Sequence, residues 1–152
     1  MFSNEIIGQN RLKNQLKQMI IESQMPHCQL FIDSMGYGGL PLALYSAMGL
    51  LRGFEVLVRA QNNRTPIQKL WGHPDLHFVY PVINKSSGSA RAVSDDYKST
   101  WDDFLHNDPY GSTQDWIRML GTGNKQGMIG VEEVTRIHHK MYLKAHDGGN
   151  KV

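Results

Sequence analysis

The chain has 152 residues, of which 40% are hydrophobic, so it is long enough for one domain with a sizeable core or for part of a larger one. Its net charge of +2 is too small to indicate nucleic-acid binding by itself, and its single cysteine excludes an internal disulfide framework and favours a reducing compartment. The opening residues lack the apolar core of a signal peptide, and no apolar stretch approaches the ~18 residues of a membrane span. We therefore expect a soluble cytoplasmic protein with no membrane partner.

The first predicted element is an amphipathic helix that ends before Pro26. Its apolar residues recur at i, i+4, i+7 and i+8 and form one face: Leu12, Leu16, Met19 and Ile20. Residues 28–32 then form a short apolar run, which predicts a largely buried strand. A glycine-rich turn follows, and the helix formers of residues 41–51 predict a second helix.

This order of strand, glycine loop and helix is that of a Walker A site, G-x-x-x-x-G-K-[ST]. Aligned with that pattern, Asp33 stands at the first glycine and Gly38 at the second. Gly39 replaces the lysine, and Leu40 replaces the Ser or Thr. Without the lysine the loop offers the β- and γ-phosphates no cation, and without the hydroxyl it cannot ligate magnesium. The loop therefore keeps the strand, glycine turn and helix order of a phosphate site but lacks the lysine and the hydroxyl that bind the phosphates and magnesium.

Two interpretations of this loop stay open. Backbone N–H groups at a helix N-terminus attract anions whatever the side chains are, so the loop can still hold a phosphate. The alternative, which we favour, is a tight strand-to-helix turn that needs small residues, because Asp33 brings a carboxylate to the place of the triphosphate. We therefore expect no bound nucleotide or other cofactor at the degenerate loop residues, which are Asp33, Gly36, Gly38, Gly39 and Leu40.

The middle of the chain is harder to interpret. Within residues 53–71, residues 54–58 resemble a strand, residues 60–66 resemble a turn, and residues 67–71 show no decisive period. Residues 76–82 form a second apolar run and predict another buried strand. Residues 84–93 are rich in Ser, Gly, Lys and Arg and predict an exposed loop. Lys85 and Arg91 offer contacts to DNA phosphates or to a partner subunit, but a solvated loop is favoured because no aromatic residues lie between them.

Three helices are predicted in the second half. Ser94 or Asp95 can cap the first of them, and Ser112 or Thr113 the second. The third spans residues 132–144. The apolar residues expected to face inward are Tyr97, Trp101, Phe104, Leu105, Trp116, Ile117, Leu120, Val134, Ile137 and Met141. Strands alternating with helices predict an α/β fold with a parallel sheet.

Several segments, taken in order, resemble one protein family. The early ones read IIGQNRLKNQLKQMI, MPHCQLFI, GYGGLPLAL and HPDLHFVYPV, and the later ones VSDDYKSTWDDFLHNDPYGSTQDW and QGMIGVEEVTRI. This combination is similar to the δ′ subunit of the bacterial DNA polymerase III clamp loader, an AAA+ assembly, as it occurs in the Bacteroidetes-type branch. The resemblance spans nearly the whole chain apart from residues 53–71.

The resemblance implies a P-loop NTPase-like (AAA+) parallel sheet with flanking helices, incomplete at the C-terminus. It implies a non-catalytic subunit that supports sliding-clamp loading in DNA replication and whose own nucleotide site is commonly degenerate. The implied partners are the other clamp-loader subunits, of γ/τ type and δ, with the sliding clamp and primed DNA as indirect partners. The alternative function is an AAA+-like ATPase with atypical nucleotide binding.

The chain departs from the family pattern in two places. The family offers an arginine, within a Ser-Arg-Cys motif, to a neighbouring subunit's ATP, and no such tripeptide occurs here. Because the lid and collar domains are also missing, we interpret residues 1–152 as a partial domain from the N-terminal side. Relatives usually carry a zinc insert with four cysteines, whereas residues 53–71 contain neither cysteine nor histidine. We therefore expect no zinc, and a local frameshift in this insert is a hypothesis.

No catalytic constellation is recognisable in the sequence. His138 and His139 are adjacent, so on a helix they point in different directions, and no HExxH pattern accompanies them. The paired carboxylates at 95–96 and 102–103 diverge for the same reason, and no GxSxG elbow occurs. Surface histidines are therefore favoured over metal ligands, and we expect neither catalytic residues nor a metal site.

Overall fold

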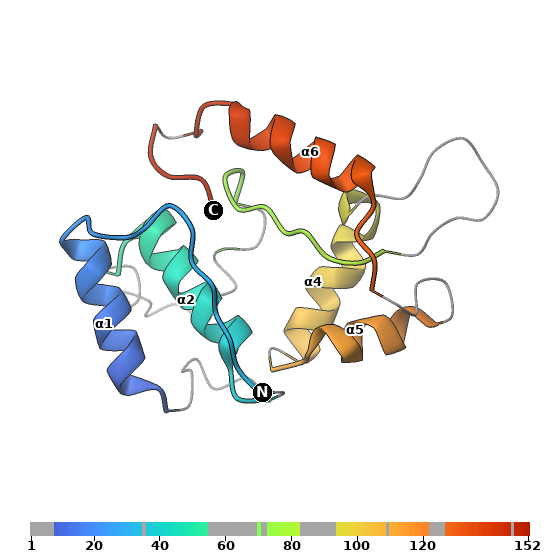
Figure 1. Ribbon diagram of the computed structural model, residues 1–152, viewed down its shortest axis with the longest axis horizontal. Coiled ribbons are helices and arrows are strands. Elements are labelled where there is room, and N and C mark those ends of the chain that lie inside the picture. The colour runs from blue at the N-terminus through green and yellow to red at the C-terminus, as the bar shows by residue number, and fades with distance from the viewer. Residues whose placement is uncertain are drawn as a thin grey trace. The chain divides into compact units, whose positions relative to one another are not determined.

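The computed structural model describes residues 8–34, 36–54, 70, 73–82, 94–108, 110–121, 127–146 and 148–152 (Figure 1). The chain divides into two compact units. The first comprises Met1–Leu76 together with Ala145–Val152, and the second comprises His77–Lys144. Buried apolar side chains form a core within each unit.

The predicted parallel sheet is wrong for the described residues. Their regular elements are all helical: α1 (Asn10–Ile21), α2 (Gly39–Arg52), η2 (Ser94–Tyr97), α4 (Lys98–Asn107), α5 (Thr113–Leu120) and α6 (Val131–Tyr142). The runs expected to be strands, residues 28–32 and 76–82, are described, and neither is a strand. A strand exists only through a ladder of backbone hydrogen bonds with a neighbour, and neither run has such a neighbour among the described residues. The expected P-loop NTPase-like (AAA+) class is therefore corrected to a helical one for this part of the chain.

In the first unit, α2 supplies most of the core. Four of its apolar side chains are at most 6% exposed: Leu42, Leu44, Ala47 and Met48. The ring of Phe54 packs so closely on α2 that a Cβ added at Gly49 would lie 2.3 Å from the Phe54 Cζ. Gly53, with φ 70°, ends the helix in a conformation that glycine adopts without strain. The prediction of a helix over residues 41–51 is confirmed, with a start two residues earlier.

Helix α1 is more exposed than its pattern suggests. On the predicted apolar face, Leu16, Met19 and Ile20 are half-buried and Leu12 is 42% exposed. The helix ends at Ile21, before the predicted boundary at Pro26. The predicted helix is confirmed, but no residue of α1 is fully buried, so this helix adds little to the core.

The last residues of the chain return to the first unit. The Asp75 carboxylate accepts a hydrogen bond from the His146 N–H (2.8 Å), and the Asp75 carbonyl accepts one from the Val152 N–H (2.9 Å). The Asn150 side chain donates to the Leu50 carbonyl at 3.2 Å. Asp75 is 3% exposed, so its two hydrogen bonds fix the end of the chain to a buried residue of the first unit.

The second unit has an aromatic core. Trp116 is fully buried and Trp101 is 8% exposed, and their rings meet edge to face with centroids 4.9 Å apart. Tyr80 stacks on Trp101 at 4.3 Å, and Phe104 lies 5.6 Å from the same ring. The predicted core positions on α4 and α5 are thus confirmed for both tryptophans and for Phe104. On the last predicted helix the inward positions of Val134 and Met141 were wrong, because these side chains are 55% and 48% exposed.

Residues 77–82 cross this core as an extended segment whose backbone is held by side chains of the helical elements. The Trp116 Nε1–H donates to the Pro81 carbonyl at 2.6 Å, and Arg136 donates to the Phe78 carbonyl at 3.1 Å. The Tyr80 hydroxyl donates to the Ser94 carbonyl at 2.6 Å, and the Tyr80 N–H donates to the Ser94 hydroxyl at 3.4 Å. Side chains here satisfy backbone groups that a neighbouring strand would otherwise satisfy.

Both predicted capping sites lie close to helix starts. Ser112 caps α5 with a reciprocal capping box, in which its hydroxyl accepts from the Asp115 N–H and the Asp115 carboxylate accepts from the Ser112 N–H. Ser94 begins the short helix η2 that leads into α4, so the predicted start there is confirmed, although the first turn is a 3-10 turn.

A buried ion cluster fixes α6 to this unit. Glu133 is 2% exposed, forms an ion pair with Arg136 and accepts a hydrogen bond from the Ser94 N–H at 2.8 Å. Arg136 also reaches Asp95 at 3.0 Å, and Lys140 reaches the other oxygen of Asp95 at 2.7 Å. Burial alone would raise the pKa of Glu133, but the hydrogen bonds from Arg136 and Ser94 outweigh it and hold that pKa below its ordinary value.

We expect Trp116→Phe to lower the free energy of unfolding by about 1–3 kcal/mol, because the buried Pro81 carbonyl would lose its donor. Urea denaturation followed by circular dichroism measures this change. The matched control is Met119→Leu on the same helix, at a side chain 49% exposed, which should shift the free energy by less than about 0.5 kcal/mol. Equal stability of Trp116→Phe and the wild type would contradict the assigned hydrogen bond.

The Glu133 cluster predicts acid sensitivity. Because the folded-state pKa of Glu133 lies below the unfolded value, its stabilisation is present above that unfolded value and is lost as the pH falls through the folded one. The free energy of unfolding of the wild type should therefore fall more steeply below about pH 5 than that of Glu133→Gln. Glu133→Gln should be less stable at pH 7 by about 1–3 kcal/mol. Urea titrations at several pH values test both statements, and parallel pH profiles of the two proteins would refute the first.

Candidate functional site

The glycine loop ends where α2 begins. Gly38 precedes the helix with φ 94°, and Gly36 has φ 81°, so both occupy left-handed backbone conformations that favour glycine. Gly39 is the first residue of α2, and Leu40 follows it in the first turn, half-buried. The local conformation agrees with the favoured interpretation of a tight turn built from small residues.

The Asp33 carboxylate lies on the N-terminus of α2. Its Oδ2 accepts a hydrogen bond from the Gly39 N–H at 2.5 Å. A Cβ added at Gly39 would lie 2.6 Å from the Asp33 Cγ, so the carboxylate rests directly against the glycine backbone. The first turn of a helix carries free N–H groups and a partial positive charge, and an anion there is stabilised by both. The chain thus places its own anion where a phosphate would bind.

This arrangement also explains the residue at the lysine position. Any side chain at Gly39 would collide with Asp33, so a lysine at this position would require the loop to change its conformation. The Leu40 side chain has no oxygen with which to ligate a metal ion in the place of the Ser or Thr hydroxyl. The structure therefore brings Asp33, Gly38 and Gly39 together as a capped turn rather than as a phosphate cradle.

The loop also contacts the start of the first helix. Gln9, which precedes α1 with φ 53°, donates from its side chain to the Tyr37 carbonyl at 3.4 Å. Tyr37 itself is 71% exposed. This bond is long and exposed, so it positions the loop only weakly.

The histidines do not converge on a metal. Among the described residues, no group of three or more His, Cys, Asp or Glu side chains has a geometry that could hold an ion. His73 is 7% exposed, and its Nδ1 accepts the Asp75 N–H at 3.2 Å, which is a structural role within a turn. His138 contacts the Tyr142 ring with centroids 5.4 Å apart on the outer part of α6.

Several predicted features lie outside the described residues. These are nearly all of residues 53–71, where the family that the sequence resembles was expected to carry a zinc insert, and the loop 84–93 with Lys85 and Arg91. Cys28 is described and is exposed, so its placement in a buried strand was wrong.

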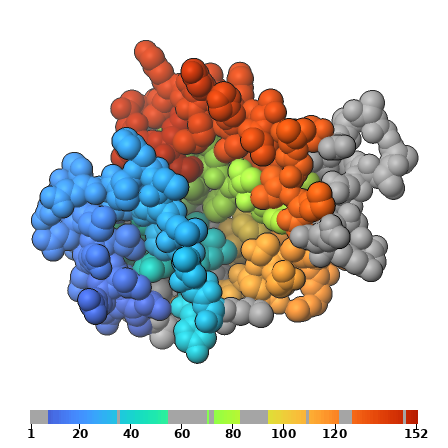
Figure 2. Space-filling view, in the orientation of Figure 1, coloured from blue at the N-terminus to red at the C-terminus, as the bar shows by residue number. Residues whose placement is uncertain are grey.

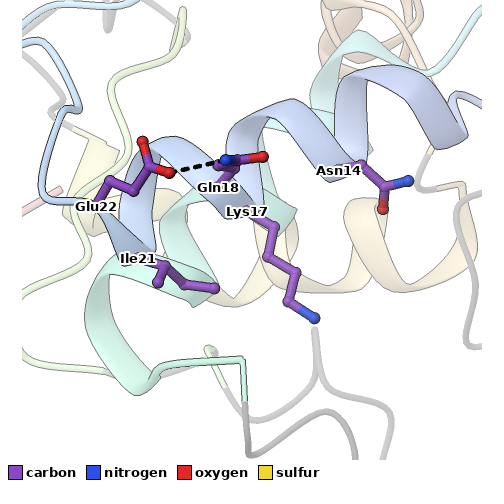
Figure 3. A pocket seen from close by; sticks show the side chains of 5 residues that line it. All are labelled: Asn14, Lys17, Gln18, Ile21 and Glu22. Carbon is purple, nitrogen blue, oxygen red and sulfur yellow. Dashed lines mark hydrogen bonds between the residues drawn. The ribbon is translucent and has the colours of Figure 1, made fainter.

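A depression of about 300 Å³ lies on α1, lined by Asn14, Lys17, Gln18, Ile21 and Glu22 (Figure 3). The Gln18 side chain donates to the Glu22 carboxylate at 2.7 Å across one turn of the helix. Four of the five residues belong to α1 and Glu22 is its C-cap, and four of the five are polar. No buried acid, base or nucleophile faces the depression from the described residues, so it has no recognisable catalytic machinery.

The comparisons with family models, with curated proteins and with solved structures find no match to this chain. Among the described residues, no helix is both long enough and apolar enough to cross a lipid bilayer.

Two parts of the structure were missed by the sequence analysis. The sequence placed a carboxylate near the loop, but it gave no sign that Asp33 would fold back six residues onto Gly39. The pairing of Glu133 with Arg136 was signalled by their i, i+3 spacing on a predicted helix, which brings oppositely charged side chains together. Their joint contact with Ser94 and Asp95 depends on tertiary packing and had no local signal.

We expect Asp33→Ala to lower the free energy of unfolding by about 1 kcal/mol, because α2 would lose its N-terminal acceptor. Asp33→Asn should cost less, since an amide oxygen can still accept from Gly39. Urea denaturation measures both effects. Asp103→Ala removes the same charge from an exposed position on α4 and should change stability by less than about 0.5 kcal/mol. Identical stability of Asp33→Ala and Asp103→Ala would contradict the capping role.

Proposed function

We propose that this chain is a non-catalytic subunit of a clamp loader, similar to the δ′ subunit of bacterial DNA polymerase III. Its work in that assembly is to bind neighbouring subunits and to support loading of the sliding clamp, without hydrolysing ATP itself. The proposal rests on the ordered sequence resemblance and on the state of the glycine loop.

The observation that carries the proposal is the hydrogen bond from the Gly39 N–H to the Asp33 carboxylate. A triphosphate at this loop would meet a carboxylate at the helix N-terminus, and like charges at such short range repel. The loop offers no lysine in compensation, because Gly39 stands in its place. A subunit that binds through its surface and holds no nucleotide is consistent with this chemistry.

The same observation weighs against the alternative, an AAA+-like ATPase with atypical nucleotide binding. Such an enzyme needs a cation or a bound metal to balance the phosphate charge and an acid or base to activate water. Among the described residues of the loop, Asp33 is the one ionisable group besides the exposed phenol of Tyr37. Neither supplies a cation near pH 7.

We expect the chain to co-elute with the γ/τ-type and δ subunits of the same organism when the three are mixed and separated by size. The complex should form without nucleotide bound to this chain, since its own loop is capped. Failure of the mixture to form a complex, with each subunit shown to be folded by circular dichroism, would refute the proposal. Saturable binding of labelled ATP to the isolated chain at micromolar concentration would favour the ATPase instead.

A further inference from the structure

Residues 145–152, hereafter the return segment, follow the second unit in sequence but belong to the first. The chain leaves the first unit after Leu76 and re-enters it at Ala145, so the second unit is an insertion within the first. In Figure 1 the red C-terminal trace comes back beside the green turn at residues 73–76. The first unit therefore assembles from two pieces of chain that are separated by the whole of the second unit.

Hydrogen bonds seat the return segment on the first unit. Asp75 accepts two of them, from the His146 N–H to its carboxylate (2.8 Å) and from the Val152 N–H to its carbonyl (2.9 Å). The Asn150 side chain donates to the Leu50 carbonyl in the last turn of α2 at 3.2 Å. None of the described residues of the segment is fully buried, and dark red atoms of the segment are visible at the surface in Figure 2. Polar contacts rather than an apolar core hold it in place.

One of these bonds closes the point at which the second unit is inserted. Asp75 lies two residues before the second unit begins, and His146 lies two residues after it ends. The 2.8 Å bond between them holds the two ends of the second unit close together. A folded second unit keeps its ends in place, whereas an unfolded one is a long flexible loop whose closure has an entropic cost.

We propose that the return segment is a latch that stays seated on the first unit only while the second unit is folded. Unfolding of the second unit releases the segment and uncovers the buried Asp75 carboxylate. By linkage, the seated segment stabilises the folded second unit in return. The coupling needs only the two chain connections, and it is independent of the proposed clamp-loader role because it uses neither the glycine loop nor a partner subunit.

The size of the two opposing effects supports the release. Each hydrogen bond raises the population of the seated segment by a net factor of about five, so the three bonds together give a factor on the order of a hundred. The effective concentration of a tethered segment falls with about the −3/2 power of the length of a flexible tether. A tether as long as the unfolded second unit therefore costs roughly a hundredfold relative to one of a few residues. Unfolding of the second unit thus removes most of the advantage that the bonds give.

Amide hydrogen exchange of the full chain, followed by NMR under native conditions, tests the release. Trp116→Phe weakens the second unit and leaves the partners of the return segment untouched. It should accelerate exchange of the His146 and Val152 N–H groups by the same factor as that of the buried Ser94 N–H, about five- to hundredfold. The Leu42 N–H of α2, which donates to the Gly38 carbonyl in the first unit, should exchange at its wild-type rate.

Met119→Leu is the matched control, because it changes an exposed side chain on the same helix as Trp116. It should leave all four exchange rates unchanged. Amides of the return segment that do not respond to Trp116→Phe would overturn the proposal. Equal acceleration of the Leu42 N–H would overturn it as well, because the two units would then unfold as one.

Asn150→Ala tests the coupling in the reverse direction. It removes the donor to the Leu50 carbonyl in the first unit and should accelerate exchange of the Ser94 N–H in the second unit about two- to fivefold. Asn14→Ala makes the same change at an exposed position on α1 and should leave the Ser94 rate unchanged. A Ser94 rate that is the same in Asn150→Ala and the wild type would rule out the reciprocal stabilisation that a latch requires.

Discussion

Backbone N–H and C=O groups that leave water must find partners, and this requirement governs how the two extended segments of the chain behave. Residues 77–82 enter a core, and the side chains of Trp116, Arg136 and Ser94 meet their backbone groups. Residues 28–32 lie at the surface beside α2, where water can serve the same groups. The side-chain bonds to the backbone of residues 77–82 and the surface position of residues 28–32 are two outcomes of the same constraint.

A second feature is that charged side chains of the chain are bonded to its own backbone or to one another. Asp33 places its carboxylate on the N-terminus of α2, the position that suits a phosphate. In the second unit, Glu133 and Arg136 neutralise each other inside a buried cluster that also includes the Ser94 N–H. Both arrangements stabilise the fold by giving each carboxylate a hydrogen-bond donor.

The helices were predictable from the local sequence pattern, whereas the predicted sheet was wrong for the described residues. The period of apolar residues located α1, α4, α5 and α6, and a run of helix-forming residues located α2. The Ser112 cap was legible because capping depends on residues three apart. The apolar runs 28–32 and 76–82 had the composition of strands, but a strand depends on a partner that composition does not specify. The degenerate loop was predicted as a strand-to-helix turn; it leads into α2 as expected, but no strand precedes it among the described residues. The contact between Asp33 and Gly39 could not be foreseen, since it depends on the path of the backbone between them.

The sequence by itself determined where the helices form, because helical hydrogen bonds and side-chain periodicity are local. It determined the buried faces of α4 and α5 but not that of α6, where Val134 and Met141 are exposed. It also determined that the glycine loop lacks a cation and a metal ligand, since those are matters of residue identity. Only the tertiary structure decided what the extended runs do and where the carboxylates of Asp33 and Glu133 lie. Those outcomes depend on contacts between residues distant in sequence, whose free energies are set by burial and by the hydrogen-bond partners that packing brings within reach.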